Sequence, residues 1–420
     1  MKVMVIGGGG REHAIVKKIK ENSNVTELFV LPGNGGIAQD ATCVDIGVKE
    51  VEKIVAFAME NRIEFAVVAP DDPLVLGVVD ALEAVDVPCF GPNKRAAILE
   101  GSKVFSKNLM KKYNIPTAQY EVFDDMTNAL EYLETAPIPT VIKADGLALG
   151  KGVVIAETRE AAKDAVRSMM GDKIFGASGD HIVIEEFLTG PEVSVLAFTD
   201  GKTMLPMVSS MDHKRALDGD KGLNTGGMGT IAPNPYYTDE IAAECMKTIF
   251  LPTMEAMNQE DRTFKGCLYF GLMLSPNGPK TIEYNCRFGD PETQVVLPLL
   301  ESDLLTIMQH IAKGTLAEAE VKFSEKAACC VIMASEGYPG KYETGFPILL
   351  PENSNRIYVA GAKIKDGIMV TGGGRVLGVT EVGITLGEAI EKAYETVKTV
   401  KFENAYYRKD IGKKALAAEV

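Results

Sequence analysis

A stretch at positions 281–294, TIEYNCRFGDPETQ, combines residue types that could do chemistry. On an extended chain alternate side chains share a face, so Glu283, Asn285 and Arg287 are predicted to point the same way. Their carboxylate and amide oxygens suit a hard metal cation, and the guanidinium suits an anion. An isolated E-x-N pair is more often a solvated strand face, so the rest of the chain must decide between the two interpretations.

A second candidate, VIKADGLALGKGVVI at 141–155, has Lys143 on a predicted strand and Lys151 at the far end of a glycine loop. Lysine ammonium groups suit phosphate oxygens, and a glycine loop can close over a nucleotide. The loop differs from a Walker A sequence, which needs GK[ST] leading into a helix. A plain hairpin with two solvated lysines is the alternative.

The predicted strand IEEFL at 184–188 follows this loop. Its backbone could bind the edge of an adenine while Glu185 or the later Glu192 holds ribose hydroxyls. Acidic pairs beside apolar strands are mostly solvated, so this signal is weak alone.

The stretch MDHKRALDGDKGLNTGGMG at 211–229 brings Asp212 and three basic residues before a glycine-rich loop. A single histidine such as His213 is more often hydrogen-bonded than catalytic, and the loop could be two ordinary turns. Together these residues predict a basic, hydrogen-bonding cradle for a small anionic metabolite.

GGGGREH at 7–13 follows a predicted strand and opens a predicted helix, so its backbone N–H groups and Arg11 could bind a phosphate. A glycine turn without a ligand is the alternative. The stretch is a poor dinucleotide fingerprint, because the third glycine of G-x-G-x-x-G falls on Glu12 and no acidic residue ends the second strand at Leu31. This argues against a nicotinamide dehydrogenase. LPGNGG at 31–36 could line the same crevice.

Alternating strands and helices must position these residues. Apolar runs at 2–6, 27–31 and 64–69, with helical spacing over 11–20, predict a parallel, doubly wound α/β unit. PTVIKAD, GVVIAE and HIVIEEF predict the strands of a compact subdomain. The later predicted elements are a helix at 239–257, strands at 267–274 and 280–286, and a helix at 385–400.

Bulk composition limits the function. A length of 420 residues predicts about three domains, and 46% hydrophobic with 24% charged residues is typical of a soluble α/β enzyme. A net charge of −14 argues against nucleic-acid binding, which needs a broad basic surface. The seven cysteines form no CxxC pair, which favours reduced thiols. We find no signal peptide and no apolar run long enough to span a membrane, so we expect a cytoplasmic protein.

The motifs follow one another in a known order. They are GGGGREH, LPGNGG, FGPNKRAAILEGSKVFSK, IPTA, IKADGLALGKGVV, EEFLTGPEVS, DHKR, NTGGMG, EYNCRFGDPETQ, GYPG and GGRVL. Each is modest alone, but this order is highly specific. Over nearly its whole length the chain resembles the glycinamide ribonucleotide synthetase family, ATP-grasp ligases of purine biosynthesis.

The resemblance implies an α/β and α+β multidomain fold. Its parts would be an N-terminal doubly wound parallel α/β domain over 1–101, ATP-grasp lobes over 102–325 with a small lid lobe at about 120–190, and a small C-terminal α+β domain over 326–420. It also implies that ATP phosphorylates glycine to glycyl phosphate, which the amine of 5-phosphoribosylamine attacks to give glycinamide ribonucleotide, ADP and phosphate.

The resemblance implies roles for individual residues. Glu283 and Asn285 would hold Mg²⁺ or Mn²⁺, and the loop 146–152 would be a lid. The expected ATP contacts are Lys103, Lys143, Gly150, Lys151, Gly152, Glu185, Glu186, Phe187, Leu188 and Glu192. The expected phosphoribosylamine contacts are Gly10, Arg11, Asn224 and Thr225. The expected catalytic residues are Arg287, Asp212, Lys214 and Asp290.

Three positions depart from the family pattern. Asp71 stands in APDDPL where GPEAPL is usual, Met211 replaces a usual Gln before DHKR, and Val359 replaces a usual His. Another ATP-grasp carboxylate–amine ligase and a non-catalytic nucleotide-binding protein are the alternatives, and DHKR with NTGGMG and the intact E-x-N pair argue against them. We expect a stand-alone monomeric ligase with small-molecule substrates, without nucleic-acid or membrane partners.

Overall fold

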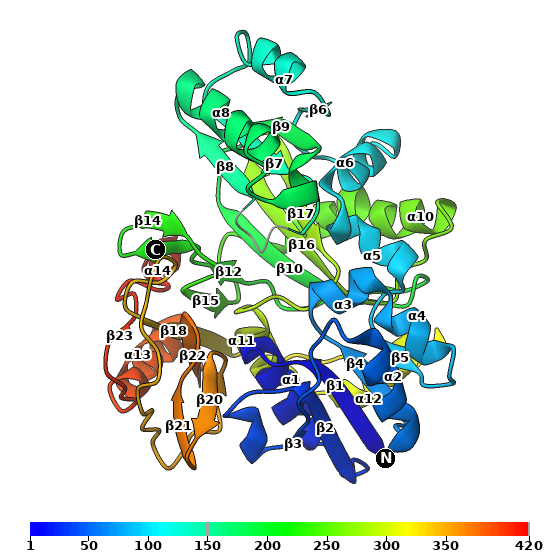
Figure 1. The fold of residues 1–420 in the computed structure, drawn as a ribbon, viewed down its shortest axis with the longest axis vertical. Coiled ribbons are helices and arrows are strands. Elements are labelled where there is room, and N and C mark those ends of the chain that lie inside the picture. The colour runs from blue at the N-terminus through cyan, green and yellow to red at the C-terminus, as the bar shows by residue number, and fades with distance from the viewer. Residues whose placement is uncertain (148–151, 419–420) are drawn as a thin grey trace.

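The structure is a computed structural model that describes residues 1–147 and 152–418. Figure 1 shows three regions: the N-terminal elements, the C-terminal strands beside them, and a taller part built from the middle of the chain. The first is a parallel sheet with helices, and the middle part is built on antiparallel sheets. The predicted multidomain α/β and α+β fold is confirmed. Among the described residues, no helix is both long and apolar enough to cross a membrane.

The N-terminal sheet is parallel, with the order β3-β2-β1-β4-β5. Its strands are β1 (Lys2–Gly7), β2 (Glu27–Pro32), β3 (Thr42–Cys43), β4 (Phe65–Val68) and β5 (Cys89–Phe90). Its helices are α1 (Gly10–Lys20), α2 (Val51–Glu60), α3 (Asp71–Leu76) and α4 (Val78–Glu83). β1 is buried over five of its six residues, which explains why a short apolar run forms a central parallel strand.

A later segment completes this domain. Helix α12 (Leu304–Lys313) and the residues before it pack into the same core as β1 and α1. Leu304, Ile307 and Met308 are buried there together with Val3 and Ile15. The N-terminal sheet therefore depends on residues about 300 positions away in sequence.

The small lobe is an antiparallel sheet in the order β6-β9-β7-β8, at the top of Figure 1. Its elements are β6 (Tyr120–Phe123), α7 (Met126–Tyr132), β7 (Thr140–Ala144), β8 (Val153–Ala156), α8 (Arg159–Val166) and β9 (Ile182–Glu186). Its apolar residues form a separate core cluster, which includes Ile142 and Ile184. This confirms the predicted compact subdomain.

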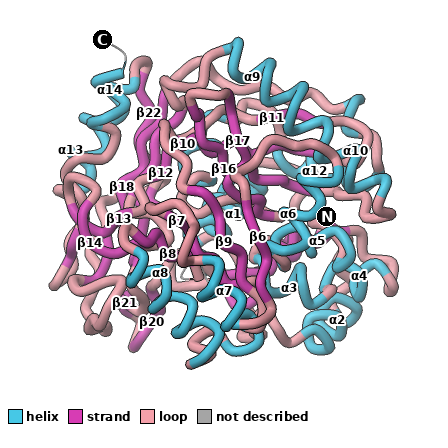
Figure 2. The backbone as a smooth tube through the Cα atoms, turned by 90° about the horizontal axis from the view of Figure 1, so that it is seen from above, coloured by secondary structure: helices cyan, strands magenta, loops and turns pink. Residues whose placement is uncertain are grey.

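The second antiparallel sheet of the middle part has the order β11-β10-β16-β17, and Figure 2 shows it between α10 and the C-terminal strands. Its strands are β10 (Glu192–Thr199), β11 (Met204–Pro206), β16 (Gly266–Ser275) and β17 (Gly278–Asn285). The helices of this region are α5 (Lys94–Gly101), α6 (Lys103–Lys112), α9 (Asp239–Cys245) and α10 (Leu251–Gln259). The two predicted strands and the helical region before them are confirmed.

The C-terminal sheet combines two parts of the chain. Its path is β12-β15-β18-β22-β19, with β23 paired to β18. The strands are β12 (Met211–Asp212), β15 (Gly229–Ala232), β18 (Ala327–Ser335), β19 (Ile357–Val359), β22 (Arg375–Gly383) and β23 (Ala405–Tyr406), and α13 (Leu386–Val397) packs on them. β12 and β15 come from the DHKR region, so this region joins the ATP-grasp lobes to the C-terminal sheet.

Candidate functional site

Strand β17 carries the central residues of the site. Tyr284, Cys286 and Phe288 are buried, whereas Glu283 and Asn285 lie on the more open face. Glu283 pairs across the sheet with Gly271, where an added Cβ would lie 3.0 Å from the Glu283 Cγ atom. The predicted alternation is confirmed, and the absence of a side chain at 271 leaves room for the Glu283 carboxylate.

Four cationic side chains surround Glu283. Its Oε1 atom lies 3.9 Å from Lys214 Nζ. Burial acts to raise the pKa of the Glu283 carboxyl, but the charges of Lys214, Lys143, Lys103 and Arg287 together lower it below its ordinary value. An ionised carboxylate within a positive cluster suits a divalent cation that is shared with phosphate oxygens.

Arg287 is held in place by helix α5. Its Nη2 atom lies 2.9 Å from Glu100 Oε1 and donates to Asn285 Oδ1 at 3.2 Å. The other Glu100 oxygen accepts the Cys286 backbone N–H at 2.6 Å. The buried Arg287 Nε atom has no hydrogen-bond partner among the described residues, so one guanidinium N–H remains for a ligand.

Two lysines approach the open face of β17 from the small lobe and α6. Lys143 Nζ donates to the Ile282 carbonyl at 3.1 Å, next to Glu283. Lys103 Nζ donates to the Gly146 carbonyl at 2.8 Å, and burial lowers the pKa of Lys103. Lys143 thus lies beside the strand that carries Glu283, and the charges of both lysines act to lower the pKa of the Glu283 carboxyl.

The predicted adenine strand is the end of β9. The Glu186 carboxylate accepts from the Gln119 backbone at 3.0 Å and from Lys280 at 2.9 Å. Phe187 is exposed and Leu188 is half-buried. Glu192 is exposed and lies 3.4 Å from Lys214, so it is the more accessible of the two predicted ribose ligands, since Glu185 is buried.

The N-terminal and C-terminal domains meet at Asp290. The Arg11 backbone N–H donates to Asp290 Oδ2 at 3.5 Å, and Arg375 Nη1 donates to the Asp290 carbonyl at 2.9 Å. Gln294 donates to Asp290 Oδ1 at 2.8 Å, and an added Cβ at Gly10 would lie 2.7 Å from Gln294 Nε2. Gly10, Arg11 and Asp290 are therefore brought together. The Arg11 guanidinium itself is committed to Glu12 at 2.6 Å and to the Phe288 carbonyl at 3.2 Å.

Asn224 is the last residue of the hairpin of β13 (Arg215–Leu217) and β14 (Lys221–Asn224), and Thr225 follows it. The Thr225 hydroxyl donates to the Lys214 carbonyl at 2.9 Å and accepts the Gly227 N–H at 3.0 Å. The Asn224 side chain is exposed. Thr225 therefore fixes the loop beside Lys214, whereas Asn224 is open to solvent.

The half-buried Asp212 and the buried Glu292 interact as an acidic pair, of which the sequence analysis assigned a role only to Asp212. Burial raises the pKa of Asp212, and the charge of Glu292 raises it further. Burial also raises the pKa of Glu292, whose Oε1 accepts the Tyr269 hydroxyl at 3.2 Å. Glu292 belongs to the GDPETQ motif, but nothing in the sequence connects it to Asp212.

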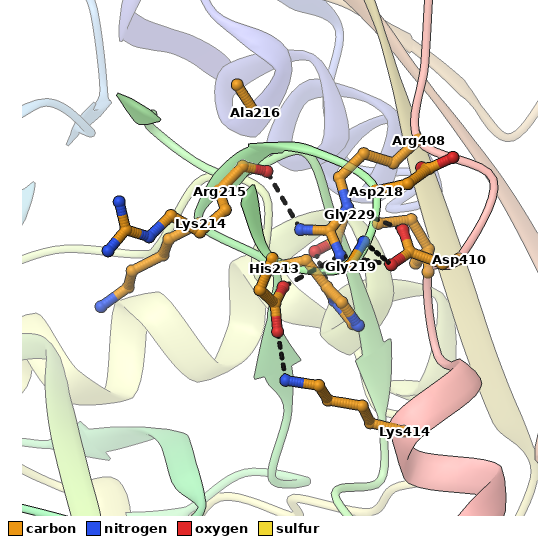
Figure 3. Close-up of polar contacts among 12 residues, drawn as sticks. His213, Lys214, Arg215, Ala216, Asp218, Gly219, Gly229, Arg408, Asp410 and Lys414 are labelled. Atoms are coloured by element: carbon orange, nitrogen blue, oxygen red, sulfur yellow. Dashed lines mark hydrogen bonds and ion pairs between the residues drawn. The ribbon is translucent and has the colours of Figure 1, made fainter. Parts of the chain in front are cut away.

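His213 has a structural environment. Its Nδ1 donates to the Gly229 carbonyl at 3.1 Å, and its Nε2 accepts the Gly412 N–H at 3.1 Å. Burial lowers the pKa of His213 to about 4, so the ring is neutral. Figure 3 shows Lys214 pointing away from the cluster around Arg408 and Asp410, on the other side of the backbone.

The family models for phosphoribosylglycinamide synthetase match the chain in three consecutive parts. The N domain matches residues 1–100, the ATP-grasp (A) domain 101–293 and the C domain 328–414. The chain belongs to this family. Its activity is that of a phosphoribosylamine–glycine ligase, an ATP-dependent ligase of purine biosynthesis.

Curated relatives agree in length and sequence. The phosphoribosylamine–glycine ligase of Caldanaerobacter subterraneus is 47% identical over 98% of this chain and 99% of its own. That of Clostridium acetobutylicum is 46% identical over 98% of this chain and 100% of its own.

Solved structures agree in fold. The phosphoribosylamine–glycine ligase structure from Thermotoga maritima has a TM-score of 0.86 at 36% identity, covering 98% of this chain and 100% of that one. A biotin carboxylase domain from Hydrogenobacter thermophilus, in complex with MgADP, has a TM-score of 0.74 at 14% identity, covering 100% of this chain and 94% of that one. The latter likeness concerns the fold alone.

The three departures from the family pattern lie in different elements. Asp71 begins α3. Burial acts to lower the pKa of Arg287, but the charge of Glu100 and then that of Asp71 raise it above its ordinary value. Met211 packs against the C-terminal core. Val359 donates its backbone N–H to His13 Nδ1 at 2.8 Å and accepts from Asn34 at 2.8 Å. These Val359 contacts use only the backbone, so the ligase family can keep them with another side chain there.

Two predicted ligands of the ligase, Gly150 and Lys151, lie outside the described residues. Gly152 is described, and its carbonyl accepts the Ala144 N–H at 2.8 Å. The lid prediction therefore stands on the sequence alone.

Proposed function

We propose that the open face of β17 binds ATP with a divalent cation and transfers its terminal phosphoryl group to glycine. The product would be glycyl phosphate, which the amine of 5-phosphoribosylamine attacks to give glycinamide ribonucleotide, ADP and phosphate. The carrying observation is that cations gather at the half-buried Glu283 carboxylate: Lys214 Nζ lies 3.9 Å from its Oε1, and Lys143 Nζ donates to the neighbouring Ile282 carbonyl at 3.1 Å. Their charges, with those of Lys103 and Arg287, act to lower the pKa of Glu283. Such a cluster neutralises the charge of a transferring phosphoryl group.

Glu283 and Asn285 are the proposed metal ligands. Both offer oxygen atoms on one face of β17, and the Glu283 carboxylate is held ionised. A bound Mg²⁺ or Mn²⁺ would neutralise phosphate charge and orient the phosphate oxygens, and oxygen ligands suit both ions.

The small lobe and its hinge are the proposed nucleotide site. Lys103 and Lys143 would contact the phosphates, the segment 185–188 the adenine, and Glu192 the ribose. The exposure of Glu192 and its neighbouring Lys214 support this assignment. Gly150, Lys151 and Gly152 of the predicted lid would exclude water from the phosphates.

Arg287 and Asp212 have the proposed roles nearest to glycine. The free Nε–H of Arg287 would hold a carboxylate or phosphoryl oxygen. The attacking amine must lose a proton, and Asp212 would accept it, since burial and Glu292 raise its pKa and make it a better base. Lys214 would balance the negative charges of Asp212 and Glu292, because its own charge acts to lower the pKa of both carboxyl groups.

The phosphoribosylamine would lie between the domains. Gly10 and Arg11 of the N-terminal domain meet Asp290 there, and Asn224 with Thr225 would close the other side. The backbone N–H groups at the start of α1 suit the substrate phosphate. We further propose a monomer with domains at 1–101, 102–325 and 326–420, which light scattering and limited proteolysis would test.

ADP release tests the assignment. We expect turnover only with ATP, Mg²⁺, glycine and freshly formed 5-phosphoribosylamine together, and a loss of about a thousandfold in Glu283→Ala, because the metal loses a ligand. Glu255→Ala, on the exposed surface of α10, should keep full activity. Full activity of Glu283→Ala would refute the proposal that Glu283 is a metal ligand. Activity with another acid in place of glycine would refute the glycine assignment.

A further inference from the structure

A buried ion triad links α6 to the small lobe. The Glu185 carboxylate, 4% exposed, lies between two lysines. Its Oε2 is 3.0 Å from Lys107 Nζ and its Oε1 is 3.0 Å from Lys143 Nζ. Both lysine side chains are at most 5% exposed. One buried carboxylate thus serves two buried ammonium groups.

The two lysines are held differently. Lys107 Nζ also donates to the Thr117 hydroxyl at 2.8 Å, which itself donates to the Thr281 carbonyl at 2.7 Å. It lies 5.5 Å from the centre of the Tyr120 ring as well. All of these partners belong to the protein framework, so Lys107 is fixed by contacts that a nucleotide would leave in place.

Lys143 is held less firmly. Among residues 1–147 and 152–418, the only hydrogen bond of Lys143 Nζ is the one that it donates to the Ile282 carbonyl, at 3.1 Å. Glu185 Oε1 has no donor in hydrogen-bonding geometry among the described residues, although Lys143 Nζ is within ion-pair distance. Lys143 is therefore the partner that can turn toward an incoming phosphate.

We propose that Lys107 is a positioning residue, which neutralises Glu185 so that Lys143 can leave this carboxylate and bind the nucleotide phosphates. The inference rests on the proposed function, in which Lys143 is a phosphate ligand. Without Lys107, each movement of Lys143 toward a phosphate would leave a buried carboxylate without a counter-ion, which proteins strongly disfavour. Glu185 would then compete with the nucleotide for Lys143.

The burial of Lys107 is consistent with this role. Burial lowers the pKa of Lys107 to about 8, although the neighbouring Glu185 acts to raise it. Lys111, one turn later on α6, is exposed and lies 5.9 Å from the same Tyr120 ring. It offers a matched control with the same helix, charge and ring contact but without Glu185.

Calorimetric titration with ADP and Mg²⁺ tests the proposal without requiring turnover. Lys107→Met should weaken ADP binding by about tenfold, and Lys111→Met should leave it unchanged. The double variant Lys107→Met/Glu185→Gln should bind more tightly than Lys107→Met, because the competing carboxylate is gone. A packing defect alone would leave the double variant as weak as the single one.

Two results would overturn the proposal: wild-type affinity in Lys107→Met, or no recovery in the double variant. Lys107→Gln is a milder substitution that keeps a donor for the Thr117 hydroxyl. It should also weaken ADP binding, and wild-type affinity there would overturn the proposal even if Lys107→Met fails to fold. Lys143→Met distinguishes the role of Lys143 from the role of Lys107. Wild-type affinity in Lys143→Met refutes Lys143 as a phosphate ligand, and the positioning role of Lys107 is refuted with it. Weakened ADP binding in Lys143→Met, together with wild-type binding in Lys107→Met, refutes only the positioning role of Lys107.

Discussion

The contacts of Arg287 require a guanidinium group and would not be made by another basic side chain. Its planar guanidinium joins Glu100 and Asn285 and keeps Nε free. We expect Arg287→Lys to lower kcat about a hundredfold, because an ammonium group cannot keep both anchors and still present a directed donor. The free energy of unfolding should fall by about 2 kcal/mol, since the buried Glu100 loses part of its pairing. Steady-state kinetics and urea denaturation measure these effects, and Arg95→Lys, at an exposed position of α5, should change neither.

At this scale the sequence predicted residues that lie within ordered motifs, such as Glu283 and Lys143. It missed Lys107 and Glu292 because their importance depends on burial and on partners distant in sequence. A lysine on a helix is ordinarily exposed, and nothing in the sequence of α6 distinguishes Lys107 from Lys111. The distinction arises only when β9 brings Glu185 to one of them.

The C-terminal segment around 408–414 packs on the β13–β14 hairpin and forms hydrogen bonds with it. Arg408 donates to the Arg215 carbonyl at 3.0 Å, and Asp410 accepts the Gly219 N–H at 2.8 Å (Figure 3). Next to these contacts, the neutral ring of His213 forms hydrogen bonds with the Gly229 carbonyl and the Gly412 N–H. Protonation would remove the Nε2 acceptor, so this element should be sensitive to acid.

The folded-state pKa of His213, about 4, lies below the ordinary value of 6.5, so the unfolded chain binds more protons between these pH values. The free energy of unfolding should therefore fall as the pH decreases from about 6.5 toward about 4, by about 3 kcal/mol from this residue. His13 acts in the same direction, because burial lowers its pKa too. Urea denaturation across this pH range measures the slope. His213→Asn should reduce it and the exposed His181→Asn should not; an unchanged slope in His213→Asn would disprove the assignment.

The elements themselves were largely predictable, because their hydrophobic periodicity is local. The runs that became β1, β16 and β17 carry their own pattern. The pairing of β15 with β18 was not predictable, since it joins residues about 100 positions apart and depends on the whole fold. The sequence predicted no strand at β12 or β15, because these short segments become strands only through tertiary pairing.

The hydrophobic core clusters of the molecule do not coincide with consecutive segments of the sequence. Among the described residues of the small lobe, the buried apolar side chains from Ala129 to Ile184 form a core cluster of their own. One face of the N-terminal sheet instead shares its core with Leu300, Leu304 and Ile307. Independent folding should follow these clusters rather than the linear boundaries.

We therefore expect a fragment of residues 118–190 to fold alone and a fragment of residues 1–101 to fail, because the latter would expose the face that α12 covers. Circular dichroism on heating should show a cooperative transition for the first fragment. The second should bind the hydrophobic dye ANS and lack such a transition. Joining 1–101 through a flexible linker to 288–325 should restore cooperativity, since it returns the missing side of the core. A cooperative transition in 1–101 by itself would show that the sheet does not need this segment.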